Sequence, residues 1–198
     1  SIRAIFPLVE HNIMRSITPE IPEGFETVFR EAMQEKDTIP VIISSHESPA
    51  DLLTIAILSK YFTDLTNEDR KDGIFFGGFT LPITPSLITG QQGLFFQQFL
   101  RGTEKRLRKY YHLTTTPFTR KKDIEQYGIQ PNPITFTNKL IEVIEKGDGV
   151  ALFPEVSVES GRPKKNDKQQ INGMRKFSGT NFNTIVKLAA RFGNKVLF

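Results

Sequence analysis

The chain has 198 residues, and its 26 lysines and arginines outnumber 22 aspartates and glutamates, giving a net charge of +4. This surplus favours anionic partners without choosing among phosphorylated metabolites, acidic proteins, lipid surfaces and nucleic acids. The absence of cysteine excludes a disulfide framework, a thiol nucleophile and cysteine-bound metals. The apolar runs are too short to span a bilayer, and the first residues lack the pattern of a signal peptide. We therefore expect one soluble domain over residues 1–198.

Helical and strand periodicities alternate along the chain after a helical lead-in over residues 1–38. The predicted helices are residues 25–33, 52–61, 94–111, 134–146 and 182–192. The predicted strands are residues 39–43, 74–79, 113–119, 149–153 and 195–198. This alternation predicts an α/β fold in which helices flank a mixed, largely parallel sheet. The last strand is expected to continue beyond Phe198, so that the domain is incomplete at its C-terminus.

Three connections between these elements are predicted to be irregular. Residues 63–73 are polar and charged, which is typical of a surface loop, and residues 166–173 are predicted to form a mobile polar loop. Prolines and glycines interrupt residues 80–93, where Leu81 and Ile88 need cover. Ordinary core packing is the simpler explanation of these apolar residues, and contact with a bound hydrophobic ligand is the alternative.

The stretch from Ser44 to Asp51 joins the first predicted strand to the helix that follows. Ser48 is a favourable N-cap, and Asp51 lies three residues later, as in a capping box. A carboxylate at that position points back toward the entering chain, which contains His46. A contact between the two side chains would fix the imidazole tautomer and leave the other nitrogen available as a general base. The alternative is a capping box beside an incidental histidine.

Further polar side chains follow other strands. Ligands of α/β proteins collect beyond the carboxyl ends of parallel strands. Glu155 follows the run Gly149 to Phe153, and Arg120 follows a third extended segment. Glu155 is therefore a candidate to share a cleft with His46 and Asp51, and Arg120 is a candidate counter-charge for an anionic substrate.

The familiar signatures of several enzyme classes are missing. The sequence contains no Gly-x-Ser-x-Gly, no P-loop, no Gly-x-Gly-x-x-Gly and no His-Glu-x-x-His. Serine hydrolases of the elbow type, nucleotide-driven phosphotransferases, dinucleotide enzymes and zincins consequently have little support.

His46-x4-Asp51, the intervening Arg120 and Phe153-Pro154-Glu155 together resemble the blocks of the glycerolipid acyltransferase family. Residues 175–180, before the last helix, are similar to the segment that follows the third block. Residues 45–51 and 160–163 resemble most closely the soluble, plastid-type glycerol-3-phosphate branch. The resemblance covers roughly residues 41–198. It implies a glycerol-3-phosphate acyltransferase-like fold and a role in the first step of phospholipid synthesis.

The resemblance also implies the roles of the residues. His46 and Asp51 would form the catalytic pair, Glu155 would bind a glycerol hydroxyl, and the phosphate-binding residues would be Arg120, Lys121 and Arg162. The acyl donor would be acyl-CoA or acyl carrier protein, with no metal and no cofactor. The loop from Leu81 to Ile88 would form part of a channel for the acyl chain, although ordinary core packing remains its simpler explanation. Where the family usually has Gly-Thr-Arg, residues 156–158 are Val-Ser-Val. Either Arg162 supplies the displaced cation, or the acceptor pocket differs.

Three other functions remain open. The acceptor would otherwise be a lysophospholipid, or the chain would be a non-catalytic phosphate- or lipid-binding domain on the same scaffold. A nucleic-acid module would use the basic residues between Arg101 and Lys109, but these lack an interleaved aromatic face, and a solvated surface explains them more simply. We therefore expect no nucleic-acid partner. The expected location is the cytoplasm or a plastid-like soluble compartment, with peripheral membrane contact left open.

Overall fold

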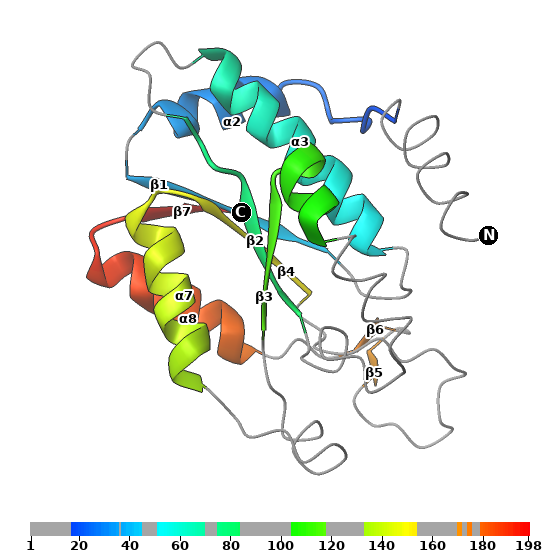
Figure 1. Ribbon diagram of the computed structural model, residues 1–198. Helices are drawn as coiled ribbons and strands as arrows, with labels where there is room; N and C mark the ends of the chain where they lie inside the picture. The colour runs from blue at the N-terminus through cyan, green and yellow to red at the C-terminus, as the bar shows by residue number, and fades with distance from the viewer. Residues whose placement is uncertain are drawn as a thin grey trace, which may run out of the picture.

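The computed structural model describes residues 17–35, 37–44, 51–69, 75–83, 104–117, 133–153, 170–171, 174–175 and 179–198. Within these residues, a five-stranded sheet forms the centre of the fold, and its strands lie in the order β3-β2-β4-β1-β7 (Figure 1). The strands are β1 (Thr38–Ile43), β2 (Phe79–Ile83), β3 (Leu113–Pro117), β4 (Gly149–Leu152) and β7 (Lys195–Leu197). Each neighbouring pair is parallel. The predicted α/β class is confirmed.

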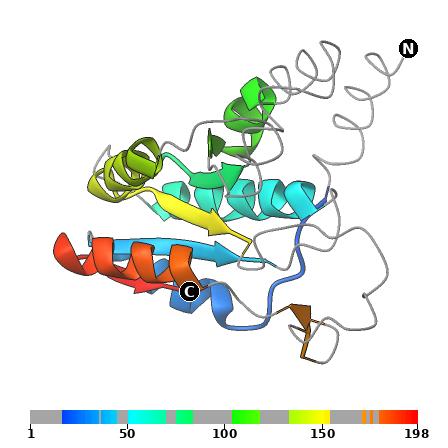
Figure 2. The same ribbon diagram turned by 90° about the horizontal axis from the view of Figure 1, so that it is seen from below.

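Helices cover both faces of the sheet. The helices α2 (Phe25–Gln34) and α3 (Asp51–Asp69) cover one face, together with the helical residues 104–111. The helices α7 (Pro133–Glu145) and α8 (Gly179–Arg191) cover the other. Figure 1 shows α2 and α3 above β1 and β4, with α7 and α8 below, and Figure 2 shows β4 and β1 running side by side in the same direction. The fold is therefore a three-layered α/β/α arrangement, as expected when parallel strands are joined by helices.

The alternation of side chains along the strands divides the core in two. Ile42 of β1 and Ala151 of β4 join the larger cluster beneath α2 and α3. Val41 and Val150, their neighbours in sequence, join the smaller cluster beneath α7 and α8. Successive strand residues point to opposite faces, so a strand covered on both sides has to be apolar throughout. This is the reason that β1 is buried almost to its end, where Ile43 is 43% exposed.

The predicted surface loop over residues 63–73 is wrong in its first part, because α3 continues to Asp69. Phe62, Leu65 and two threonines are buried along this extension. The hydroxyl of Thr66 donates a hydrogen bond of 2.7 Å to the carbonyl of Phe62, one turn earlier. A threonine that bonds back to its own helix can be buried in it, so the polar composition of this segment did not indicate exposure.

The second strand also lies later than predicted. Residues 74–79 were predicted to form it, but β2 begins at Phe79, and Phe75 is 76% exposed. The strand begins after Gly78, whose φ of +105° is unfavourable for other residues. A Cβ at Gly78 would lie 2.0 Å from the carbonyl oxygen of His112, so the two backbones meet at this point. The glycine, rather than the run of phenylalanines, determines where pairing with β3 starts.

A short hairpin replaces the end of the loop predicted over residues 166–173. The strands β5 (Gln170–Ile171) and β6 (Met174–Arg175) pair in an antiparallel register. The sequence between them is Asn-Gly, the dipeptide most typical of two-residue hairpin turns. That dipeptide would have predicted the hairpin, whereas the polar composition of the segment suggested a loop.

Candidate active site at the carboxyl ends of β1 and β4

The strands β1 and β4 end side by side. Ile43 is paired with Leu152, and the backbone N–H of Ser44 donates a hydrogen bond of 3.1 Å to the carbonyl of Leu152. Neighbouring strands of a sheet lie about 4.8 Å apart. The chain therefore leaves the sheet at two adjacent points of the same edge, once before the segment that contains His46 and once before Phe153-Pro154-Glu155.

Close contacts hold the amino end of β4 against β2. A Cβ on Gly149 would lie 2.5 Å from the ring of Phe79, so only glycine allows this approach of β4 to β2. The carboxylate of Asp148 accepts a hydrogen bond of 2.8 Å from the backbone of Gly77. The amino end of β4 is thereby tied to the segment that leads into β2, while residues 150–152 pair with β1 on the other side.

Asp51 is the one predicted site residue within the described part of the chain. It lies in the first described turn of α3 and is half-buried. A carboxylate in the first turn of a helix is stabilised by the helix dipole. The remaining predicted site residues lie outside the described residues, so their convergence stays a prediction; they are His46, Arg120, Lys121, Glu155 and Arg162.

Three of these residues follow the last paired residue of a strand by the same number of positions. Ile43 is paired with Leu152, and His46 and Glu155 each follow their member of this pair by three residues. Arg120 likewise follows Pro117, the last paired residue of β3, by three residues. All three strands are parallel, so their carboxyl ends lie at the same end of the sheet. The strand order puts β2 and β4 between β3 and β1, which separates Arg120's strand from that of His46.

Leu81, the first residue of the loop expected to line an acyl channel, is part of the core. Leu81 is 1% exposed and belongs to the core cluster beneath α2 and α3. It lies within β2, and its partner in β3 is Thr115. Leu81 is therefore core, as the simpler interpretation held, while residues 84–93 lie outside the described residues.

His112 lies immediately before β3, at the amino ends of the strands and therefore opposite the candidate site. Its φ of +52° ends the helical residues 104–111, and its Nε2 lies 3.7 Å from a carboxylate oxygen of Asp64. Its carbonyl accepts hydrogen bonds from the hydroxyl of Ser59 at 3.0 Å and from the backbone of Phe79 at 2.9 Å. The residue thus joins the middle of α3 to the amino-terminal ends of β2 and β3, and it takes no part in the candidate site.

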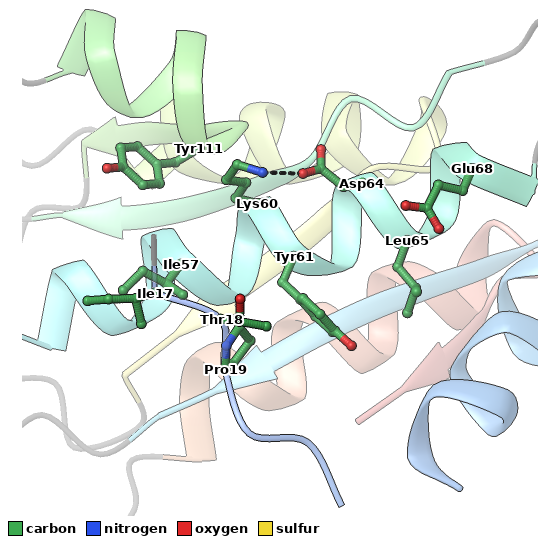
Figure 3. A pocket seen from close by; sticks show the side chains of 10 residues that line it. All are labelled: Ile17, Thr18, Pro19, Ile57, Lys60, Tyr61, Asp64, Leu65, Glu68 and Tyr111. Carbon is green, nitrogen blue, oxygen red and sulfur yellow. Dashed lines mark hydrogen bonds and ion pairs between the residues drawn. The ribbon is translucent and has the colours of Figure 1, made fainter. Parts of the chain in front are cut away.

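A pocket of about 220 Å³ lies along α3 rather than at the strand ends (Figure 3). Its walls come from residues 17–19, from the middle and last turns of α3, and from Tyr111. Lys60 and Asp64 form an ion pair at its rim. No local sequence pattern indicates this pocket, because three separate segments form it and no motif marks any of them.

Ion pairs and hydrogen bonds fasten α2 to α3 next to this pocket. Arg30 contacts both Asp69 and Glu68, which raise the pKa of its guanidinium further. It also donates a hydrogen bond of 3.2 Å to the carbonyl of Leu65, in the last turns of α3. Burial, followed by a hydrogen bond to Glu26, raises the pKa of Tyr61 to about 12. These groups stabilise the helical layer and lie away from the strand ends.

Comparison with protein-family models gives no match, and comparison with curated protein sequences gives none either. The described residues contain no group of three or more histidine, cysteine, aspartate or glutamate side chains placed to hold a metal ion. Among the same residues, no helix combines the length and the apolar character needed to cross a membrane.

Proposed function

We propose that the chain is an acyltransferase that moves a fatty acyl group from a thioester to a hydroxyl of glycerol 3-phosphate. The family resemblance of His46-x4-Asp51 and Phe153-Pro154-Glu155 suggests this reaction. The observation that carries the proposal furthest is the pairing of Ile43 with Leu152, because it makes the two motif-bearing segments leave the sheet next to each other. In the sequence these segments are remote, and strand order could have separated them.

In this proposal His46 is the general base. Attack on a thioester requires the acceptor hydroxyl to lose its proton as its oxygen bonds to the carbonyl carbon, and an imidazole with an ordinary pKa of about 6.5 suits that task. The thiolate of the donor leaves, so no covalent enzyme intermediate is needed. Asp51, in the first turn of α3, accepts a hydrogen bond from the other ring nitrogen and stabilises the imidazolium.

The remaining residues bind the acceptor. Glu155 bonds a glycerol hydroxyl, while Arg120, Lys121 and Arg162 hold the phosphate, for which the planar guanidinium fork is well suited. The strands β3 and β1 are three positions apart in the sheet, roughly 14 Å. Three extended residues span about 10 Å, and the arginine side chain adds further reach. The chain length after β3 therefore suffices to bring Arg120 to a substrate lying over β4.

The base assignment is tested with His46→Ala. We expect turnover, measured as thiol release from a soluble acyl donor in the presence of glycerol 3-phosphate, to fall by about 10² to 10⁴. His112→Asn is the matched control, because asparagine tolerates the positive φ of this position and His112 lies at the amino ends of the strands, away from the candidate site. Substantial turnover by a folded His46→Ala protein contradicts the proposal.

The phosphate site is tested separately. Arg120→Ala should raise the KM for glycerol 3-phosphate more than it lowers kcat, because the lost contacts bind the phosphate of the acceptor and not its reacting hydroxyl. An unchanged KM would remove Arg120 from the acceptor site. A wild-type preference for lysophosphatidate over glycerol 3-phosphate would move the chain to the alternative acyltransferase class. Calorimetric binding of glycerol phosphate without turnover would support the non-catalytic alternative.

A further inference from the structure

The helical residues 104–111 present two contrasting faces. Leu107 and Tyr111 are buried in the core beneath the helical layer. Lys105, Arg108 and Lys109 are exposed. Their spacing of three and four residues aligns them on one side of the helix. The outer side of residues 104–111 is thus a cationic surface, which we call the basic face and define by these three residues.

Of the five other lysines in the described part of the chain, all but Lys187 pair with a carboxylate. Lys60 pairs with Asp64, Lys139 and Lys146 both pair with Glu142, and Lys195 pairs with Glu35. The described residues provide no ion pair for the basic face, although Glu104 is exposed in the adjoining turn. Like charges three and four residues apart destabilise a helix by a few tenths of a kcal/mol. An anionic partner would relieve this repulsion.

The surroundings of the basic face favour a lipid surface over a small anion or a specific acidic protein. The ammonium of Lys109 lies 5.0 Å from the ring centre of the half-buried Tyr110. Amphipathic aromatic rings beside lysines are typical of the headgroup region of membranes. Among the described residues, the pocket along α3 reaches only Tyr111, on the buried side of residues 104–111. Charge spread over the exposed side suits a fluid layer of headgroups.

We propose that the basic face binds peripherally to membranes that contain anionic phospholipids. The inference goes beyond the proposed reaction and does not depend on it, because binding to vesicles is measured without acyl donor or acceptor. Each basic residue close to such a surface contributes roughly a five-fold gain in affinity, and the attraction falls within a Debye length. Three residues therefore give weak, reversible and salt-sensitive binding.

The experiment compares two double variants of the full chain. Lys105→Gln with Lys109→Gln removes two charges four residues apart from the basic face. Lys187→Gln with Arg191→Gln removes two charges of the same spacing from α8, where both residues are exposed. The control surface lies on the opposite layer of the fold, because α8 packs with the other core cluster. Circular dichroism verifies that both variants are folded.

Cosedimentation with vesicles of phosphatidylcholine, with and without phosphatidylserine, provides the measurement. We expect wild-type binding only to the vesicles with phosphatidylserine, a loss of about twenty-five-fold in the Lys105/Lys109 variant, and little change in the control. Absence of wild-type binding at low salt overturns the proposal, as do equal losses in the two variants. Binding to soluble polyglutamate but not to the vesicles would also overturn it, in favour of an acidic protein partner.

Discussion

Gly78→Ala tests whether the junction before β2 aligns the sheet as described. Gly78 has a φ of +105°, and a Cβ there would lie 2.0 Å from the carbonyl oxygen of His112. Real Cβ contacts essentially never fall below 3.0 Å, so one of the two backbones has to move. The same carbonyl accepts the hydrogen bonds from Phe79 and Ser59, and its displacement weakens both.

The expected cost is the sum of two contributions. Holding alanine in a disfavoured backbone region costs about 1 to 3 kcal/mol. Weakening two hydrogen bonds adds roughly 0.5 to 1.5 kcal/mol each. The total is about 2 to 6 kcal/mol, which is a large part of the stability of an ordinary domain, about 5 to 15 kcal/mol. Gly78→Ala should therefore be severely destabilised or unable to fold.

Urea denaturation followed by circular dichroism provides the measurement. Gly147→Ala is the matched control, because Gly147 has a φ of +70° but a Cβ at this position would meet nothing within 4 Å. It carries the backbone penalty alone, about 1 to 2 kcal/mol. The difference between the variants isolates the clash with His112. If Gly78→Ala is no less stable than Gly147→Ala, the close approach of these backbones is refuted.

Two further predictions concern the core and the pH dependence of stability. Leu140→Ala, at a fully buried site, should cost about 2 to 5 kcal/mol in urea denaturation, whereas Val186→Ala on the exposed side of α8 should cost less than about 1. Equal losses would contradict the assignment of Leu140 to the core. Tyr61 has its pKa raised from 10.0 to about 12, so its neutral form stabilises the fold below pH 10, and this contribution is lost as the pH rises through about 12. Tyr61→Phe should abolish that loss, and identical alkaline stability profiles of wild type and variant would contradict it.

Local patterns predicted most elements correctly. The apolar run of β1, the amphipathic faces of α2, α7 and α8, and the glycine after α8 each depend on residues close in sequence. The predictions failed where composition misled. The end of α3 looked polar, but Thr66 satisfies its hydroxyl within the helix. The phenylalanines before β2 looked like a strand, but pairing begins only after Gly78.

The candidate site shows the same division. The sequence supplied the motifs around His46 and Glu155 and the capping position of Asp51, because these are patterns of neighbouring residues. It did not indicate that β4 would lie between β1 and β2. Strand order depends on contacts between remote segments, such as Gly149 against Phe79, which no local pattern encodes.

The sequence by itself determined that apolar strands alternate with amphipathic helices, because the periods of two and 3.6 residues follow from backbone geometry. It also determined which chemical groups follow each strand. Only the tertiary structure decided that Ile43 is paired with Leu152, and thus that the ends of β1 and β4 are neighbours. The physical reason is that pairing is decided by the simultaneous packing of both sheet faces and by close backbone contacts across the whole chain.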